Sequence, residues 1–262
     1  MHVFPGVDVS ALFSGDNEDT GMIGGTKELY REFLENLSTK QGRWYRSELT
    51  CFISLKGREF YKRRELLVVG RAVNGWLCSD QAENWKAPEK RDEFIEKIFK
   101  DKTPITWVSE QWGSAEKYNT KRSAFWRVAR ELVRKLEIAD IGNNDWPSHI
   151  AWSNLYKVAP AAGGNPSETL KEAEFQYCTK ILSTEIMELK PRRIAFLTGL
   201  KWAEQFLGAL GADPSGRYAN CRLEASGRLS SESNFVVLPH PQGKPESEIV
   251  DAAVHGFARL SQ

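Results

Sequence analysis

Four short apolar runs alternate with amphipathic helical patterns along the chain. The first run, Leu66 to Val69, is continuously apolar and ends at Gly70, which is typical of a buried parallel strand that leads into a functional loop. Three further strands are predicted within residues 149–160, 192–199 and 234–241. Helices are predicted over residues 26–40, 122–138 with Ser123 as the N-cap, 172–191, 200–211 and 246–261.

This alternation predicts an α/β fold, a three-layer α/β/α sandwich around a central, mainly parallel four-stranded sheet. Residues 1–50 are expected to form an N-terminal arm and helix, and residues 51–262 the α/β/α domain. Ligands of such sheets bind beyond the carboxyl ends of the strands. The candidates for a site are therefore the residues that follow the strands, at 70–76, 154–160, 199 and 240–244.

The composition is ordinary for a soluble globular protein, with 41% apolar and 27% charged residues. A formal net charge of +1 excludes a strongly basic protein that coats nucleic acid, but it leaves a local basic patch open. The sequence has neither an apolar stretch of membrane-spanning length nor the pattern of a secretory leader, so a cytoplasmic protein is expected. The four cysteines are far apart, without a C-x-x-C pair, and this favours buried thiols over a metal site.

His240 is one of four histidines, and it stands between Pro239 and Pro241 at the end of the last predicted strand. Proline fixes its own φ and restricts the residue before it, so the chain leaves this strand along one path. A histidine held so rigidly at the ligand-binding edge of a sheet is a candidate catalytic residue. The alternative is a strand-end histidine whose ring is satisfied by the backbone.

Four segments follow one another in an order that resembles the uracil-DNA glycosylase superfamily: VVGRAVNGW (68–76), SAFWRVARELV (123–133), SNLYKVAP (153–160) and VVLPHPQGK (236–244). The first is similar to the family's loop that cradles the base and places a water, and the second to a helix of its mismatch-specific branch. The third is similar to the segment with the pyrimidine-reading asparagine, and the fourth to the His-Pro-Ser motif. The resemblance covers residues 65–260 and implies a uracil-DNA glycosylase-like fold.

The resemblance implies chemical roles for two residues. His240 is expected to donate a hydrogen bond to O2 of the departing pyrimidine, best as a neutral imidazole. Asn74 is expected to position the attacking water, although an amide cannot take its proton. Asp80 and Glu83 are weaker candidates for a carboxylate near this water.

The same resemblance implies binding residues. The base is expected to meet Asn154, Gly70, Arg71 and Ala72, with Trp107, or else Trp76, stacked on it. DNA is expected to contact Lys157, Gln242, Gly243 and Lys244.

The motifs also depart from the family's pattern. The first lacks Asp-Pro, the fourth has Gln242 in place of serine with no leucine after it, and the cysteine spacing of the iron–sulfur branch is absent. The tryptophan-rich surroundings, together with Arg71, favour a base bulkier than uracil.

The predicted function is that of a monofunctional DNA glycosylase that acts as a monomer and needs no metal or other cofactor. It would hydrolyse the N-glycosidic bond of a flipped-out pyrimidine and leave an abasic site in duplex or single-stranded DNA. The base would be uracil or a bulkier pyrimidine, such as a hypermodified phage base, in DNA repair or phage defence. Two alternatives stay open: an inactive nucleic-acid-binding module on the same fold, and an enzyme that processes free nucleosides or nucleotides.

Overall fold

A central mixed sheet is built on the four predicted strands. In the computed structural model, which describes residues 19–40, 42, 44–75, 78–100, 105–116, 118–142, 144–217, 222–229 and 233–261, this sheet has the strand order β2-β5-β3-β7-β10-β9-β8. Its middle is parallel and comprises β5 (Ile150–Asn154), β3 (Leu66–Gly70), β7 (Arg193–Leu197) and β10 (Asn234–Leu238). Every residue of β3 and β5 is buried, as the continuously apolar run of β3 predicts.

The predicted α/β/α class is confirmed, but the predicted number of four strands is wrong. Antiparallel strands extend the sheet at both edges: β2 (Leu55–Lys56) pairs with β5, and β9 (Ala225–Arg228) and β8 (Asp213–Arg217) follow β10. A separate three-stranded sheet joins β4 (Ser79–Gln81), β1 (Glu48–Cys51) and β6 (Val158–Pro160). These strands are short, and several contain Gly, Pro or Asp, so β propensity does not reveal them.

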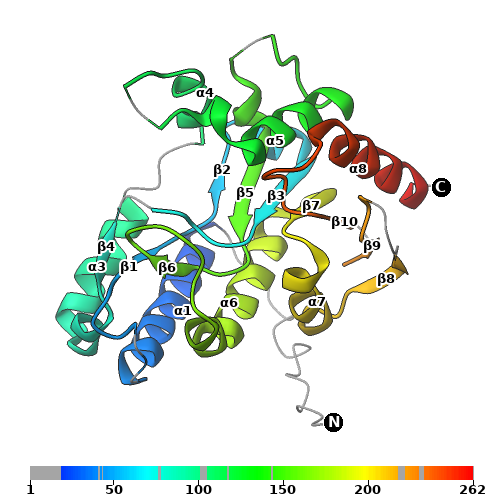
Figure 1. The fold of residues 1–262 in the computed structure, drawn as a ribbon. Helices are drawn as coiled ribbons and strands as arrows, with labels where there is room; N and C mark the ends of the chain where they lie inside the picture. Colours follow the sequence, from blue (N-terminus) through cyan, green and yellow to red (C-terminus); the bar gives the residue numbers. More distant parts are fainter. Residues whose placement is uncertain are drawn as a thin grey trace.

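Helices cover both faces of the central sheet (Figure 1). α1 (Asp19–Thr39), α6 (Glu168–Leu189) and α7 (Leu200–Ala209) share one buried cluster with Leu67 and Val69 of β3. α5 (Ala124–Lys135) and α8 (Glu246–Leu260) share a second cluster with Leu66 and Val68. Successive residues of a strand point to opposite faces, so the apolar run of β3 supplies both cores.

Six further helical segments lie in the described chain. They are α2 (Phe60–Arg63), α3 (Pro88–Lys100), α4 (Trp107–Glu110) and the 3₁₀ segments η2 (Ala82–Lys86), η3 (Thr120–Arg122) and η4 (Trp146–His149).

The predicted helices are present, with shifted ends. α5 begins after Ser123, at the predicted N-cap. α6 begins at Glu168, four residues before the predicted start, because the hydroxyl oxygen of Ser167 accepts a hydrogen bond from the Leu170 N–H at 3.3 Å. It ends at Leu189, and the C-cap residue Lys190 has a left-handed φ of 44° and precedes Pro191.

α1 packs into the same core as the central domain. Its apolar side, including Tyr30 and Leu37, is fully buried, and the Tyr30 hydroxyl donates to the main-chain oxygen of Phe52 at 2.7 Å. The boundary predicted after residue 50 falls inside β1, so this strand crosses it. Among the described residues, no helix has the length and apolar character needed to cross a membrane.

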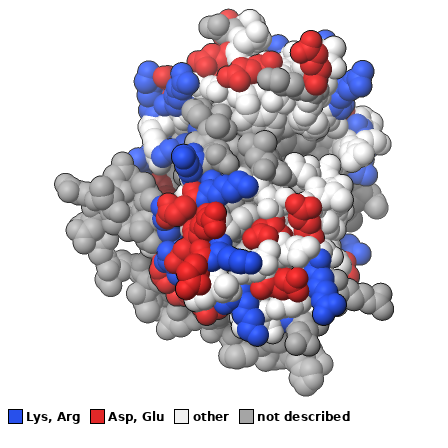
Figure 2. All heavy atoms as spheres, turned by 90° about the vertical axis from the view of Figure 1, so that its left-hand side faces the viewer, with Lys and Arg blue, Asp and Glu red and all other residues white. Residues whose placement is uncertain are grey.

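The outer face formed by α1 and α3 carries charges of both signs. Lys27 pairs with Glu96 at 2.8 Å, and Arg31 pairs with Asp92 at 2.6 Å. Figure 2 shows Lys and Arg side chains interspersed with Asp and Glu on this side of the molecule. Among the described residues, this face therefore lacks the single-sign field that a nucleic-acid surface presents.

Candidate nucleic-acid and base-binding site

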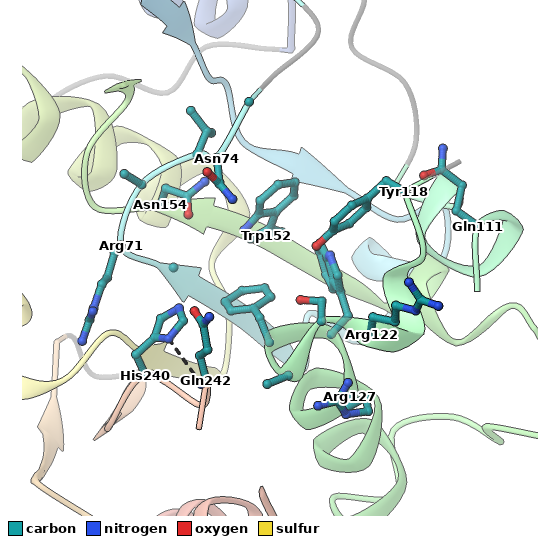
Figure 3. A pocket seen from close by; sticks show the side chains of 18 of the residues that line it. Arg71, Asn74, Gln111, Tyr118, Arg122, Arg127, Trp152, Asn154, His240 and Gln242 are labelled. Atoms are coloured by element: carbon teal, nitrogen blue, oxygen red, sulfur yellow. Dashed lines mark hydrogen bonds between the residues drawn. The ribbon is translucent and has the colours of Figure 1, made fainter. Parts of the chain in front are cut away.

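A pocket of about 1160 Å³ opens where the parallel strands end. Its walls come from the loop after β3, the end of β5, the loop after β10 and the segment from α4 to the start of α5 (Figure 3). The sequence-predicted residues that line it are Gly70, Arg71, Ala72, Asn74, Trp107, Asn154, His240, Gln242 and Gly243. The topology thus brings residues of all four sequence motifs to one cavity at the expected edge.

Asn154 presents an amide to the pocket from the end of β5. The residue is 1% exposed, and its Nδ2 has no hydrogen-bond partner among the described residues. Gly70 is its neighbour across the β3–β5 ladder, and a Cβ on Gly70 would lie 2.4 Å from Asn154 Oδ1. A buried amide donor without a partner is costly unless a ligand satisfies it, so Asn154 is suited to bind a polar ligand edge.

The loops that follow β3 and β5 are fastened to each other by main-chain hydrogen bonds. The Leu155 N–H donates to the Gly70 oxygen and the Tyr156 N–H to the Arg71 oxygen, each at 2.9 Å. These bonds continue the parallel ladder beyond the strands and hold Asn154 in register with the glycine loop. The site therefore stands on the rigid sheet rather than on a free loop.

His240 contributes a neutral imidazole with a defined tautomer. The Gln242 main-chain N–H donates to Nδ1 at 3.4 Å, which places the ring proton on Nε2 (Figure 3). Partial burial, and then the positive charges of Arg71 and Lys244, lower the pKa of His240 from 6.5 to about 4. At neutral pH the ring is therefore an uncharged hydrogen-bond donor at the pocket wall.

Comparison with known proteins matches the chain to one family. The family model described as the uracil DNA glycosylase superfamily matches residues 96–244, which is more than half of the chain. The chain belongs to the uracil-DNA glycosylase superfamily. None of the curated proteins compared with the chain matches it.

The superfamily match includes Asn154 and His240 and begins after the glycine loop at 70–75. Within that loop, Arg71 Nε donates to the Thr198 oxygen at 2.7 Å, and its guanidinium lies 5.1 Å from the Trp202 ring centroid. Arg71 is thus a fixed positive charge near His240, and burial lowers the pKa of its guanidinium. Ala72 is half-buried and lines the pocket without a polar group.

Asn74 lies at the exposed rim of the pocket. Its Oδ1 accepts the Gly164 N–H at 2.7 Å, and Gly163 and Gly164 both have a left-handed φ. The bond orients the amide but leaves a second lone pair on Oδ1. Asp80 and Glu83, the weaker candidates for a carboxylate, do not line the pocket. Asp80 Oδ1 accepts a hydrogen bond from Asn84 Nδ2 at 2.7 Å, and Glu83 Oε2 lies 4.0 Å from Arg46 Nε.

Phe125 is a pocket aromatic that the sequence reasoning missed. One edge of its ring lies 3.4 Å from the Cβ position of Gly70, the same position that Asn154 Oδ1 approaches. Trp107 also lines the pocket, but its rings pack edge-on against Trp126 at 5.7 Å. Trp76 lies outside the described residues. The sequence offered one signal for Phe125: it stands two positions after the predicted N-cap Ser123, in the first turn of a predicted helix.

The turn after His240 presents its backbone at the pocket mouth. The Lys244 N–H donates to the Pro241 oxygen at 3.0 Å, and Gly243 has a φ of 71° that favours glycine. Gln242 and Gly243 line the pocket, whereas the exposed Lys244 lies outside its lining.

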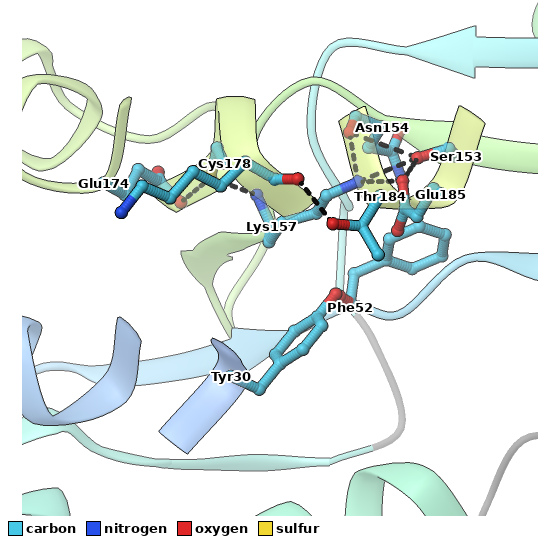
Figure 4. A network of polar contacts seen from close by, with 10 residues as sticks. Tyr30, Phe52, Ser153, Asn154, Lys157, Glu174, Cys178, Thr184 and Glu185 are labelled. Atoms are coloured by element: carbon cyan, nitrogen blue, oxygen red, sulfur yellow. Dashed lines mark hydrogen bonds and ion pairs between the residues drawn. The ribbon is translucent and has the colours of Figure 1, made fainter. Parts of the chain in front are cut away.

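The prediction that Lys157 contacts DNA is wrong. The side chain is 0% exposed, and all three ammonium protons are used inside the protein. Nζ donates to Glu185 Oε2 at 2.7 Å, to Ser153 Oγ at 2.8 Å and to the Asn154 oxygen at 2.8 Å (Figure 4). The Lys157 side chain points into the protein interior, where it holds the main chain of Asn154.

Proposed function

We propose that this protein is a DNA glycosylase that hydrolyses the N-glycosidic bond of a flipped-out pyrimidine. The observation that carries the proposal is the pairing of two groups at one pocket: the buried, unpartnered amide donor of Asn154 and the neutral imidazole of His240. An amide with a free donor suits the polar edge of a pyrimidine. A neutral imidazole suits an oxygen on which negative charge develops.

In the proposed reaction, the bond between the base and C1′ breaks and its electron pair stays on the base. The Nε2–H of His240 stabilises this charge at O2 of the pyrimidine, and one preorganised donor of this kind is worth about 2.7–4 kcal/mol in the transition state. A water held by Asn74 adds to C1′ and loses its proton to solvent, since an amide does not accept it.

The base is proposed to stack on Phe125, because this ring and the Asn154 amide flank the same glycine. Gly70 allows the Asn154 amide to lie close to the backbone, since a side chain at position 70 would occupy the space of that amide. Trp107 stays a second candidate for stacking, as it lines the same pocket.

The pocket volume leaves room for a base bulkier than uracil. About 1160 Å³ exceeds the range of roughly 300–1000 Å³ that is usual for small-ligand pockets, and one pyrimidine fills only part of it.

Excision is tested with a panel of single- and double-stranded oligonucleotides that carry uracil or modified pyrimidines. The oligonucleotides are incubated with excess protein and then treated with alkali, which cleaves at abasic sites. We expect strand scission on at least one substrate, and mass spectrometry of the released base identifies it. His240→Ala should lower the rate by about a hundredfold to a thousandfold while product DNA still binds.

His255→Ala is the matched control, because His255 is exposed on α8 and does not line the pocket. Scission on no member of the panel would overturn the proposal.

Glu110 is the sole carboxylate among the described lining residues, and this favours an inactive DNA-binding module as the second candidate. That module would bind abasic DNA in a salt-dependent way without releasing any base.

A further inference from the structure

A row of four aromatic side chains runs through the pocket. Ring centroids are 6.3 Å apart from Phe125 to Trp152, 6.2 Å from Trp152 to Trp107 and 6.5 Å from Trp107 to Tyr118. All four residues line the pocket, and Tyr118 at the outer end is 58% exposed. One extruded pyrimidine beside Asn154 would take up one stacking position, which leaves the outer end of the row open to another planar group.

Two arginines without partners line the same pocket. Arg58 and Arg122 are exposed, and neither guanidinium has a hydrogen-bond or ion-pair partner among the described residues. Arg127, by contrast, is paired with Glu246. Figure 3 shows Arg122 and Tyr118 together on the side of the pocket that is away from His240.

We propose that the outer end of the pocket is a second subsite, which binds a neighbouring nucleotide of the same DNA strand. The neighbour's base stacks on Tyr118, and its phosphate lies against Arg122, with Arg58 adding positive charge. The proposal rests on the proposed function, since the DNA strand that delivers a base to Asn154 also brings its neighbour to the pocket mouth.

The chemistry of the outer end favours a nucleotide over a substituent of the excised base. An exposed aromatic face binds a planar ring, and unpaired guanidinium groups bind an anion, and a nucleotide supplies both. A neutral substituent would need hydrogen-bonding groups rather than the unpaired cation of Arg122. Glu110 also lines the pocket and opposes a phosphate, so Glu110→Gln should tighten DNA binding.

The test is a double-mutant cycle between the protein and the DNA. The probe is a single-stranded oligonucleotide with a tetrahydrofuran abasic analogue at the target position, so that binding needs no excision. In a second probe, the bases on either side of the target are also replaced by abasic analogues. Dissociation constants are measured for the wild type, Tyr118→Ala and Tyr118→Phe, with Tyr61→Ala as the control at an exposed tyrosine that does not line the pocket.

For the wild type, Tyr118→Phe and Tyr61→Ala, removing the neighbouring bases should weaken binding by about fivefold to a hundredfold, as expected for the loss of one stacked base. In Tyr118→Ala this penalty should disappear, because the stacking partner is already gone. An equal penalty in Tyr118→Ala and the wild type would overturn the subsite. An effect of Tyr118→Ala that appears only when the target base carries a substituent would also overturn it.

Arg122 is tested by the salt dependence of binding to the first probe. Arg122→Ala should reduce the slope of log K against log salt by about 0.7, the value for one contact to a single-stranded phosphate. Arg122→Lys should keep the slope, and Arg192→Ala, a charge removed at the opposite edge of the sheet, should leave it unchanged. An unchanged slope in Arg122→Ala would overturn the phosphate contact.

The outcomes separate this subsite from the proposed function. Coupling in the cycle without excision of any base would support the subsite and reject the glycosylase. Excision without coupling would reject the subsite alone. Failure to bind either probe would reject the subsite on single-stranded DNA, and the excision assay alone would then decide the glycosylase.

Discussion

Lys157 donates a hydrogen bond from its ammonium group to the main-chain oxygen of Asn154 at 2.8 Å, at a position that solvent does not reach. The charge is balanced by Glu185 on α6, whose Oε2 also accepts the Ser153 hydroxyl at 2.6 Å. A buried ion pair therefore stands directly behind the amide that faces the pocket (Figure 4). Fully hydrogen-bonded networks of this kind hold one geometry, since any displacement leaves a buried charge unpaired.

Replacing one member of this pair should destabilise the protein strongly. Lys157→Met leaves the Glu185 carboxylate buried without its cation, so the free energy of unfolding should fall by about 3–5 kcal/mol. The double variant Lys157→Met/Glu185→Leu removes both charges and should recover most of the loss. Urea unfolding followed by circular dichroism measures both values. Equal stability of Lys157→Met and the wild type would show that the pair is not coupled to folding.

The double variant also tests whether the pair positions Asn154. The Asn154 main-chain oxygen loses its donor in this variant, and small shifts of a binding group can lower a rate by about a hundredfold. We expect slower base excision with unchanged binding of abasic DNA. A rate equal to that of the wild type in the folded double variant would limit the role of the pair to stability.

The sheet was predictable because its central strands carry the strongest signal that a sequence gives. A run such as Leu66 to Val69 buries both faces, and the residue at its end must lie at the ligand-binding edge. This reasoning predicts from the sequence alone that Gly70, Asn154 and His240 lie at the same edge of the sheet. All three line the pocket. The edge strands could not be predicted in this way. β8, for example, has the sequence Asp-Pro-Ser-Gly-Arg, which is poor in β-forming residues.

Lys157 and Phe125 show what local patterns leave out. A lysine after a strand is exposed in most proteins, and its burial here depends on Glu185, which is distant in sequence and brought in by α6. Phe125 lies on a helix whose apolar face predicts core packing, and its approach to Gly70 depends on how α5 meets the sheet. Both positions are set by contacts between elements, which periodicity alone does not specify.

Gly70→Ala should impair the site more than the fold. A Cβ at this position would meet Asn154 Oδ1 at 2.4 Å, so the amide must move out of its present position. We expect base excision to slow by about a hundredfold, and Asn154→Gly in the same background should not slow it further. Gly208→Ala is the control: Gly208 lies in α7 with open space at its Cβ, so this change should raise stability by about 0.4–1 kcal/mol without affecting excision. Normal excision by Gly70→Ala would contradict the role of the close contact.

The rate of base excision should be insensitive to pH near neutrality. The pKa of His240 is lowered to about 4, so the ring stays neutral at higher pH and protonates only as the pH approaches that value. A histidine with an ordinary pKa of 6.5 would lose its neutral form at a pH about 2.5 units higher. Lys244→Gln removes one of the charges that lower this pKa and should move the acid limb toward neutral pH. Single-turnover rates between about pH 3.5 and 8 measure the acid limb of the wild type and of Lys244→Gln. A decline beginning near pH 6.5 in the wild type would refute the neutral donor.

Glu174 should make folding stability fall as the pH rises. Burial raises the pKa of this carboxyl from 4.5 to about 8, although its Oε2 accepts the Val158 N–H at 2.9 Å and the Cys178 thiol at 3.2 Å. Between these two pKa values the folded protein holds a proton that the unfolded chain has released. The free energy of unfolding should therefore decrease by about 1.4 kcal/mol per pH unit from this group.

Glu174→Gln isolates that contribution, because the amide keeps the shape and the acceptor oxygen but does not titrate. Relative to the wild type, the variant should gain about 1.4 kcal/mol of stability for each pH unit between about 5.5 and 7.5. Cys178 adds no slope in this range, since burial holds the pKa of its thiol well above the ordinary value. Urea unfolding of both proteins at pH 5.5, 6.5 and 7.5 measures the difference. Parallel curves would mean that Glu174 is ionised in the folded protein, and the buried network would then carry one more negative charge than we infer.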